Sequence, residues 1–362
     1  MPEALKNSYN IDYVSNLAKV VGQHRKRFPA KRFIESVIDS DWEERELKQR
    51  MSHIRVCLHE ALKLPFDQAL NVLIPAAEHF GGYEAMFFPE YVEAYGLDHW
   101  DRSMQALETL TQYSSSEFAV RPFILRDSER MMKQMVTWSR HDNPHVRRLA
   151  SEGCRPRLPW AQALPVFKKQ PEPILPILDN LKADDSLYVR RSVANNLNDI
   201  SKDNPQVTLK WAKANIGKHS DTDWIIKHAS RTLLKQGHPK ALGLFGYRAA
   251  DHVKIAGLSI ENPNPKIGDT MAFSFEVSGK RGRAPLGKLR VEYAIDYLKA
   301  NGSHSRKVFK VAEGDYRDPN LSFQRQQSFR QMSTRKHYAG EHRLAIIVNG
   351  VERALATFDL KR

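Results

Sequence analysis

Acidic and basic side chains alternate along one short stretch of the sequence. In HDNPHVRRLASEG (141–153) and the residues that follow it, Arg148, Glu152 and Arg155 are spaced by four and three. A helix places residues at this spacing on one face. A carboxylate flanked by guanidinium groups could make an anionic spot within a cationic surface. On spacing alone, ordinary ion pairs on a solvated helix explain the pattern as well.

A second stretch repeats the same order of residues, which is a short polar turn, an apolar residue and then two arginines. We call this order the repeated phrase. In ADDSLYVRRSVANNL (183–197) and the residues after it, Arg191, Asn195 and Asp199 are spaced by four and four. If the two helices are neighbours on one concave surface, their carboxylates come close together within a basic cleft. Such preorganised acids can stabilise positive charge that develops during a reaction.

Aromatic residues near these stretches are candidates for stacking on bases or sugars. Trp160 lies in a loop bracketed by prolines, beside Arg155 and Arg157, and is the best candidate. Trp138 and Trp224 are more typical of a core. We expect Trp138 before the first basic helix and Trp224 at the start of the third copy of the repeat.

A further acid, Glu117, is expected at the start of a helix on the same side as these elements, where an acid is also an ordinary partner of the helix dipole. No nucleophilic triad or phosphate-binding glycine loop is visible in the sequence. The fourteen histidines are scattered, and Cys57 and Cys154 do not have the spacing of metal ligands. We therefore expect no metal or redox cofactor.

The repetition itself predicts the architecture of the first two thirds of the chain. The phrase occurs at 141–153 and 183–197, more loosely as SDTDWIIKHASRTLL (220–234), and in a shorter form at 114–127. A period of roughly 40 residues is typical of stacked helical hairpins of the HEAT kind. We expect a HEAT-like helical-repeat solenoid with a basic concave face.

Within each copy the residues have separate tasks. Short polar side chains should cap the second helix of each hairpin, the candidates being Asp142 or Asn143, Asp185 or Ser186, and Asp221 or Asp223. The apolar residue that follows should point into the seam between repeats, namely Val146, Val189 and Ile226.

The pattern changes near residue 250. Apolar residues then alternate with smaller or polar ones, as at Met271, Phe273, Phe275 and Val277. Several short strands of this kind are typical of an immunoglobulin-like sandwich. We expect two domains, a helical-repeat domain over 1–250 and a small all-β domain over 251–362.

The overall charge indicates a polyanionic partner. The chain has 362 residues and a net charge of +14, with 41% hydrophobic residues. Its last 112 residues carry 20 Lys and Arg against 12 Asp and Glu, so more than half of the excess lies there. This β domain is either a DNA-contacting extension or a solvated surface. Nucleic acid is the first expectation and an anionic membrane the second.

No apolar run approaches the roughly 18 residues of a membrane span. We expect a cytoplasmic protein without membrane contacts.

Three long segments resemble one family. The segments at 88–124, 136–160 and 187–205 are similar to the AlkC branch of the DNA alkylation-repair glycosylases, which are HEAT-like proteins related more distantly to the AlkD branch. The resemblance covers about residues 10–245. The β domain resembles, more weakly, the immunoglobulin-like extension of some AlkC members.

The resemblance implies a monofunctional DNA N-glycosylase that removes 3-methyladenine, 3-methylcytosine and 1-methyladenine from duplex DNA. It implies Glu117 and Asp199 as the catalytic acids, with Glu152 as the next candidate. Trp160 would pack on the deoxyribose or the lesion, and Arg148 would orient the carboxylates or hold a phosphate. The basic residues expected at the DNA are Arg147, Arg155, Arg157, Arg190, Arg191, Lys227 and Arg231.

Two other functions remain open at this stage. HEAT arrays often bind proteins or nucleic acid without catalysing a reaction, so a non-catalytic scaffold is the main alternative. A damage sensor that has lost activity is the second. Acids in a cationic groove weaken phosphate binding, and their presence therefore favours an enzyme. We expect a monomer that associates with the nucleoid through alkylated DNA. Whether such an enzyme flips the base out of the duplex or acts on it in an open groove stays open on the sequence alone.

Overall fold

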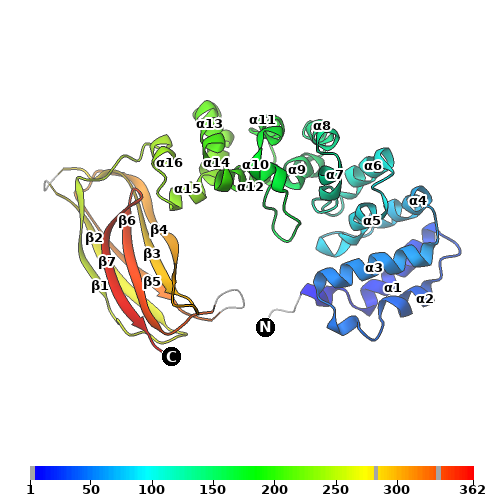
Figure 1. Cartoon of the computed structure of the whole chain (residues 1–362), viewed down its shortest axis with the longest axis horizontal. Coiled ribbons are helices and arrows are strands. Elements are labelled where there is room, and N and C mark those ends of the chain that lie inside the picture. The colour runs from blue at the N-terminus through cyan, green and yellow to red at the C-terminus, as the bar shows by residue number, and fades with distance from the viewer. Residues whose placement is uncertain (1–4, 281–283, 332–335) are drawn as a thin grey trace. The chain divides into compact units, whose positions relative to one another are not determined.

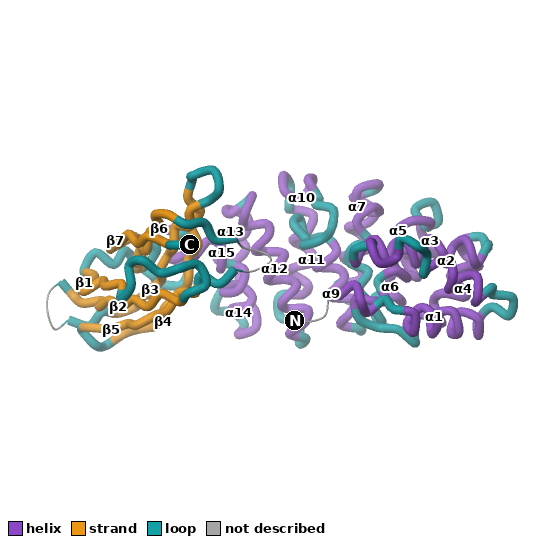
Figure 2. Tube along the Cα trace, turned by 90° about the horizontal axis from the view of Figure 1, so that it is seen from below, coloured by secondary structure: helices purple, strands orange, loops and turns teal. Residues whose placement is uncertain are grey.

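The computed structural model describes residues 5–280, 284–331 and 336–362. The chain forms two compact units, Met1–Ala229 and Ser230–Arg362. Among the described residues, strands occur only in the second unit (Figures 1 and 2). The expected combination of a helical-repeat region and an all-β immunoglobulin-like domain is confirmed. No helix in these ranges is long and apolar enough to cross a membrane.

The first unit is a row of short helices that follow one another in chain order (Figure 1). These helices are α1 (Ile11–His24), α2 (Ala30–Val37), α3 (Leu47–Leu62), α4 (Phe66–Ala77), α5 (Phe87–Tyr95), α6 (Trp100–Leu110), α7 (Arg121–Arg126), α8 (Ser128–Trp138), α9 (Pro144–Gly153), α10 (Pro165–Lys169), α11 (Leu175–Leu181), α12 (Leu187–Asp203), α13 (Pro205–Asn215) and α14 (Ser220–Ala229). Short 3-10 helices lie at η1 (Leu5–Ser8), η2 (Trp42–Glu44), η3 (Tyr83–Ala85) and η4 (Glu172–Ile174).

The repeated phrase forms α9, α12 and α14, which pack in that order. Val146, Val189 and Ile226 are fully buried, so the prediction that they fill the seam between repeats is confirmed. Asn143 caps α9, because its side chain accepts a hydrogen bond from the backbone N–H of His145. The apolar residue that recurs in each copy of the repeated phrase is therefore buried where the three helices pack against one another.

The second unit begins with α15 (Arg231–Lys235) and α16 (Pro239–Leu244) and continues as seven strands. These strands are β1 (Val253–Ile260), β2 (Thr270–Gly279), β3 (Gly287–Leu298), β4 (His304–Tyr316), β5 (Asn320–Ser328), β6 (Gly340–Val348) and β7 (Val351–Leu360). One antiparallel sheet has the order β1-β2-β5 and the other β4-β3-β6-β7.

The sandwich core comes from alternation along the strands. Met271, Phe273 and Phe275 on β2 point into the core, as the period of two predicts. Asn349 and Gly350 join β6 to β7 with φ values of 47° and 78°. This left-handed Asn-Gly pair is the favoured connection of a tight hairpin.

Candidate functional site

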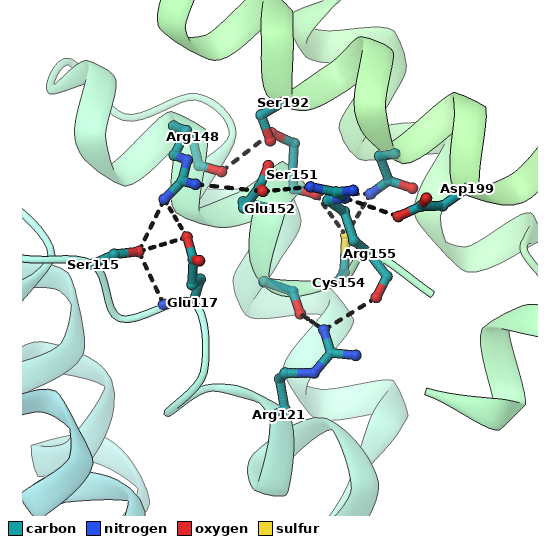
Figure 3. A network of polar contacts seen from close by, with 12 residues as sticks. Ser115, Glu117, Arg121, Arg148, Ser151, Glu152, Cys154, Arg155, Ser192 and Asp199 are labelled. Carbon is teal, nitrogen blue, oxygen red and sulfur yellow. Dashed lines mark hydrogen bonds and ion pairs between the residues drawn. The ribbon is translucent and has the colours of Figure 1, made fainter. Parts of the chain in front are cut away.

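Three carboxylates and two guanidinium groups alternate in one continuous network (Figure 3). Arg148 Nη1 lies 2.5 Å from Glu117 Oε2, and Arg148 Nη2 lies 3.4 Å from Glu152 Oε1. Arg155 Nη1 lies 2.6 Å from the same oxygen of Glu152, and Arg155 Nε donates to Asp199 Oδ2 at 2.9 Å. The structure thus brings together the three acids that the sequence singles out.

The three acids differ in burial and in the number of their partners. The exposed fraction of the side chain is 14% for Glu117, 7% for Glu152 and 2% for Asp199. Both oxygens of Asp199 are engaged, since Lys202 Nζ lies 3.1 Å from Oδ1. Glu117 receives Arg148 and Ser115 at Oε2, while its Oε1 has no hydrogen-bond partner among the described residues. Glu117 is therefore the acid best placed to meet a bound molecule.

The guanidinium groups remain charged despite their burial. Burial lowers the pKa of Arg148, but the carboxylates of Glu152 and Glu117 outweigh it and the pKa is raised above its ordinary value. Burial likewise opposes the carboxylates of Glu152 and Asp199 at Arg155, whose pKa is also raised. Ion pairs that exclude water interact more strongly than exposed pairs. The network is consequently a fixed array of opposite charges.

Aromatic surface lies beside this array. The guanidinium carbon of Arg148 lies 5.0 Å from the ring centre of Tyr188, which is 44% exposed. Sequence reasoning missed this tyrosine, although it occupies the same place in its repeat as His145 does in the preceding one. An exposed ring next to an arginine is a platform on which a base or sugar can stack.

The loop that carries Trp160 is held in place by two cations, the exposed Lys48 and the buried Arg121. Trp160 is 70% exposed and has a φ of 63°, a left-handed conformation that is strained for a residue with a side chain. Lys48 Nζ donates to the Trp160 carbonyl at 2.6 Å. The fully buried guanidinium of Arg121 donates to three carbonyls at the base of the loop, those of Gly153, Arg155 and Gln162.

Neither cation was among the predicted site residues. Arg121 has the register of the first arginine of each repeat, since Val120-Arg121 matches Val146-Arg147, and this signal was available in the sequence. Burial lowers the pKa of Arg121 to about 10. No sequence signal identifies Lys48, which reaches the loop from α3, 112 residues away in the chain.

The first arginine of each doublet joins one repeat to the next. Arg147 Nε donates to Asp184 Oδ2 at 2.6 Å, and Arg190 Nη2 lies 3.3 Å from Asp221 Oδ1. Both guanidinium groups also donate to backbone carbonyls of the turn that precedes their own helix. As DNA contacts, Arg147 and Arg190 stay predictions, and they would have to give up these partners to reach a phosphate.

The other predicted basic residues lie in different surroundings. Arg157 is 40% exposed in its side chain and pairs with Asp203 at 2.6 Å, and Arg191 is exposed on α12. Lys227 lies on α14 and Arg231 on α15, both half-buried. Arg155, by contrast, is enclosed within the carboxylate network.

Three local predictions need correction. Glu117 does not begin a helix but lies in the turn before α7, because the helix starts only at Arg121. Helix α9 ends at Gly153, so Arg155 reaches Glu152 from the segment after the helix. Trp224 is 38% exposed and stacks on His228 at 5.2 Å, so it is not a core residue.

The prediction for Trp138 is confirmed. Its side chain is 1% exposed, and its indole Nε1 donates to Glu108 at 2.7 Å. Within the described parts of the chain, no group of three or more His, Cys, Asp or Glu side chains has the arrangement of a metal site.

Comparison with known proteins gives matches along the whole chain. The family model for DNA alkylation repair enzymes matches residues 98–233, and the model for the C-terminal Ig-like domain of the uncharacterised protein YhaZ matches residues 254–362. YhaZ of Bacillus subtilis is 49% identical over 347 residues, or 96% of each chain. The structure of the alkylpurine DNA glycosylase AlkC from Pseudomonas fluorescens, bound to DNA with an abasic site analog, is 40% identical with a TM-score of 0.95 and covers 99% of this chain and 100% of its own.

Proposed function

The chain belongs to the family of Pseudomonas fluorescens AlkC and Bacillus subtilis YhaZ, and we propose on this basis that it is a monofunctional DNA glycosylase. It hydrolyses the N-glycosidic bond of cationic N-alkylated bases in duplex DNA. The bases proposed as substrates are 3-methyladenine, 3-methylcytosine and 1-methyladenine.

The observation that supports this proposal most strongly is the alternating network itself. Glu117, Glu152 and Asp199 lie within a chain whose net charge is +14. A protein that only binds the phosphate backbone gains nothing from acids in its binding surface, because they repel phosphates. An enzyme that generates positive charge on the sugar does gain from them.

The reaction needs little help with the leaving group. A base alkylated in this way carries a positive charge, and cleavage of its bond to C1′ transfers the bonding electron pair to the base, which departs neutral. The sugar is left as an oxocarbenium ion. A water molecule then adds to C1′ and gives up a proton. Carboxylates that face the sugar stabilise the cation and accept that proton.

We assign these tasks by accessibility. Of the three acids, Glu117 has the most exposed side chain, and its Oε1 has no hydrogen-bond partner in the described part of the chain, so it faces the sugar and the attacking water. Arg148 holds Glu117 in place, and Glu152 and Asp199 hold the two guanidinium groups. Trp160 and Tyr188 provide aromatic surface for the deoxyribose or the lesion.

Double-stranded DNA is the proposed partner of a monomeric enzyme. The related AlkC structure contains DNA with an abasic site analog, which resembles the product of base removal. Arg157, Arg191, Lys227 and Arg231 are the proposed backbone contacts, which would position the duplex without reading its sequence.

Chromatography of the free bases tests the proposal. Methylated duplex DNA incubated with the enzyme should release 3-methyladenine or 3-methylcytosine, while the same duplex without methylation should release no base. Protein that binds the methylated duplex and releases nothing would be a non-catalytic member of the family.

A further inference from the structure

A run of basic residues, HRKRFPAKR (24–32), connects α1 to α2. Between residues 13 and 34 the chain carries six Lys and Arg and no Asp or Glu. Five of these cations follow closely on one another, and all but the half-buried first one are exposed; they are Arg25, Lys26, Arg27, Lys31 and Arg32. We call this segment, residues 25–32, the basic turn.

Little of the charge on the basic turn is neutralised by the described residues. Lys31 lies 4.0 Å from Glu35, and both side chains of this pair are largely exposed. In the part of the chain that the structure describes, Lys26, Arg27 and Arg32 form no ion pair. An exposed ion pair such as Lys31–Glu35 contributes little to stability and is easily exchanged. The charge of the basic turn is therefore available to a polyanionic partner.

The backbone of the basic turn is fixed by its own contacts. The Phe28 N–H donates to the Arg25 carbonyl at 2.9 Å, and the Ala30 N–H donates to the Phe28 carbonyl at 2.9 Å. The Phe28 ring is buried and packs against Phe33, with the ring centres 5.4 Å apart. A loop that is already ordered loses less conformational entropy when it binds a partner. The cations are thus presented from a defined turn between two helices.

The basic turn lies away from the reaction centre. Helices α1 and α2 lie with α3 at the end of the row of helices opposite α14 (Figure 1). Lys48, in the first turn of α3, reaches the Trp160 carbonyl, whereas the carbonyl of Ser36, near the end of α2, contacts His53 in the middle of α3. Because α3 has 16 residues, it is about 24 Å long. The start of α2 and the basic turn before it are therefore displaced from the Trp160 loop toward the end of the first unit.

The surrounding part of the chain is acidic. Residues 33–112 carry 15 Asp and Glu against 6 Lys and Arg. A duplex that continued from the reaction centre across these helices would meet an excess of negative charge, which repels phosphates. The basic turn is thus a separate cationic patch, better placed for a different segment of DNA than for the flank of the damaged one.

We propose that the basic turn binds the phosphate backbone of a second DNA segment while the reaction centre holds the first. Lysine and arginine side chains on an exposed turn bind phosphates without reading the sequence. A protein that contacts two segments at once can pass from one to the other without becoming free in solution. This proposal rests on the proposed glycosylase function and adds to it a surface that serves the search for damage.

The rate at which the full-length protein leaves a labelled duplex tests the proposal. The protein is first bound to a short fluorescent duplex with an abasic site analog, and an unlabelled, unmethylated duplex is then added as competitor. If the protein must become free before it rebinds, the dissociation rate does not depend on the competitor concentration. If the competitor binds first at a second site, the rate rises with that concentration. We expect wild type to show a rise of at least about threefold over a tenfold range of competitor.

Two variants of equal net charge assign this behaviour to the basic turn. The first removes three exposed charges of the turn by Lys26→Gln, Arg27→Gln and Arg32→Gln. Its dissociation rate should no longer depend on the competitor, while the rate without competitor stays within about twofold of wild type, because the reaction centre is unchanged. The matched control removes three exposed charges from α13 and the turn after it by Lys210→Gln, Lys213→Gln and Lys218→Gln, and it should behave as wild type.

Three results would overturn the proposal. The first is a wild-type dissociation rate that is independent of the competitor, and the second is an equal dependence in the variant of the basic turn. The third is a variant that keeps this dependence but binds a long duplex more weakly than wild type does, which would place the turn on the flank of the damaged duplex. No step of the assay requires base release. A wild type that transfers between duplexes but releases no base would therefore contradict the proposed function alone.

Discussion

Arg148 Nη1 lies 2.5 Å from Glu117 Oε2, and the same guanidinium group contacts Glu152 through Nη2. This relationship joins the turn before α7 to helix α9 and gives the most exposed acid of the network a fixed orientation. Both Arg148, on α9, and Ser115, in the turn before α7, donate hydrogen bonds to Glu117. The position of Glu117 therefore depends on side chains from two separate elements.

Replacement of Arg148 should therefore damage catalysis more than DNA binding. Arg148→Lys keeps the charge but replaces the planar guanidinium, which reaches Glu117 through Nη1 and Glu152 through Nη2, by a single ammonium nitrogen. We expect the single-turnover rate to fall by about 10–100-fold, the range of a lost orienting or electrostatic contact, with DNA affinity changed by less than threefold. The exposed Arg140 provides the control, and Arg140→Lys should retain the full rate. Equal losses of rate and affinity would place Arg148 at a phosphate instead.

Loss of the Arg147–Asp184 pair should weaken the fold. The Asp184 side chain is 5% exposed, and Asp184→Asn leaves the Arg147 guanidinium without its charged partner. Breaking such a pair costs about 3 kcal/mol, which urea unfolding would detect. The exposed pair Glu129–Lys133 is the comparison, since Glu129→Gln should change stability by less than about 0.5 kcal/mol. Similar small effects at both sites would show that the inter-repeat pair is not structural.

Lys48 should act on the site through Trp160. Lys48→Met removes the hydrogen bond to the Trp160 carbonyl, so the loop loses one of its two cationic anchors. We expect a broadened 19F resonance of 5-fluorotryptophan at position 160, identified by its absence from Trp160→Phe, and a lower kcat. Lys48→Arg, which keeps a donor, should restore part of both. A sharp, unshifted resonance in Lys48→Met would exclude this role.

Folding stability should depend on pH through Glu93. Its pKa is raised from the ordinary 4.5 to about 7, so the folded protein holds this proton more tightly than the unfolded chain does. Stability is then highest below pH 4.5 for this group and declines as the pH rises to 7, by at most about 3 kcal/mol. Urea unfolding of Glu93→Gln should show a smaller loss between pH 5 and pH 8 than wild type. Parallel curves for the two proteins would contradict the assignment.

The second unit should contribute to DNA affinity. We propose that its β domain grips DNA, because the last 112 residues carry 20 basic against 12 acidic residues. Helices α15 and α16 cluster with the strands, so a truncation after Ala229 leaves the first unit whole. We expect weaker binding and a shallower dependence of affinity on salt concentration. An unchanged salt slope would assign the β domain to stability or solubility.

The sequence predicted those features that depend on local periodicity. Val146 and Val189 recur at one place in each repeat, so the seam and the order of the helices could be read directly. The spacing of Arg148 and Glu152 likewise predicted that they share one helical face, and the two side chains are in contact because both lie within α9. Alternation along β2 predicted the core of the sandwich for the same reason.

Features that depend on contacts between distant segments could not be read. Lys48 reaches Trp160 across 112 residues, and the register of Arg121 places it in the repeat without indicating which carbonyls it contacts. The spacing also gives no sign that Arg147 and Arg190, which stay predicted DNA contacts, pair with acids of the next repeat. Periodicity reports which face a residue occupies but not which partner it meets there.

Single-turnover base release by wild type and Glu117→Gln tests the central claim most directly. On duplex DNA containing 3-methyladenine or 3-methylcytosine, wild type should release the free base. Glu117→Gln should bind the duplex within threefold of wild type but release the base at least about 100-fold more slowly, as expected when a transition-state contact is lost. Wild-type protein that binds the methylated duplex and releases no base, or a variant as fast as wild type, would contradict the account.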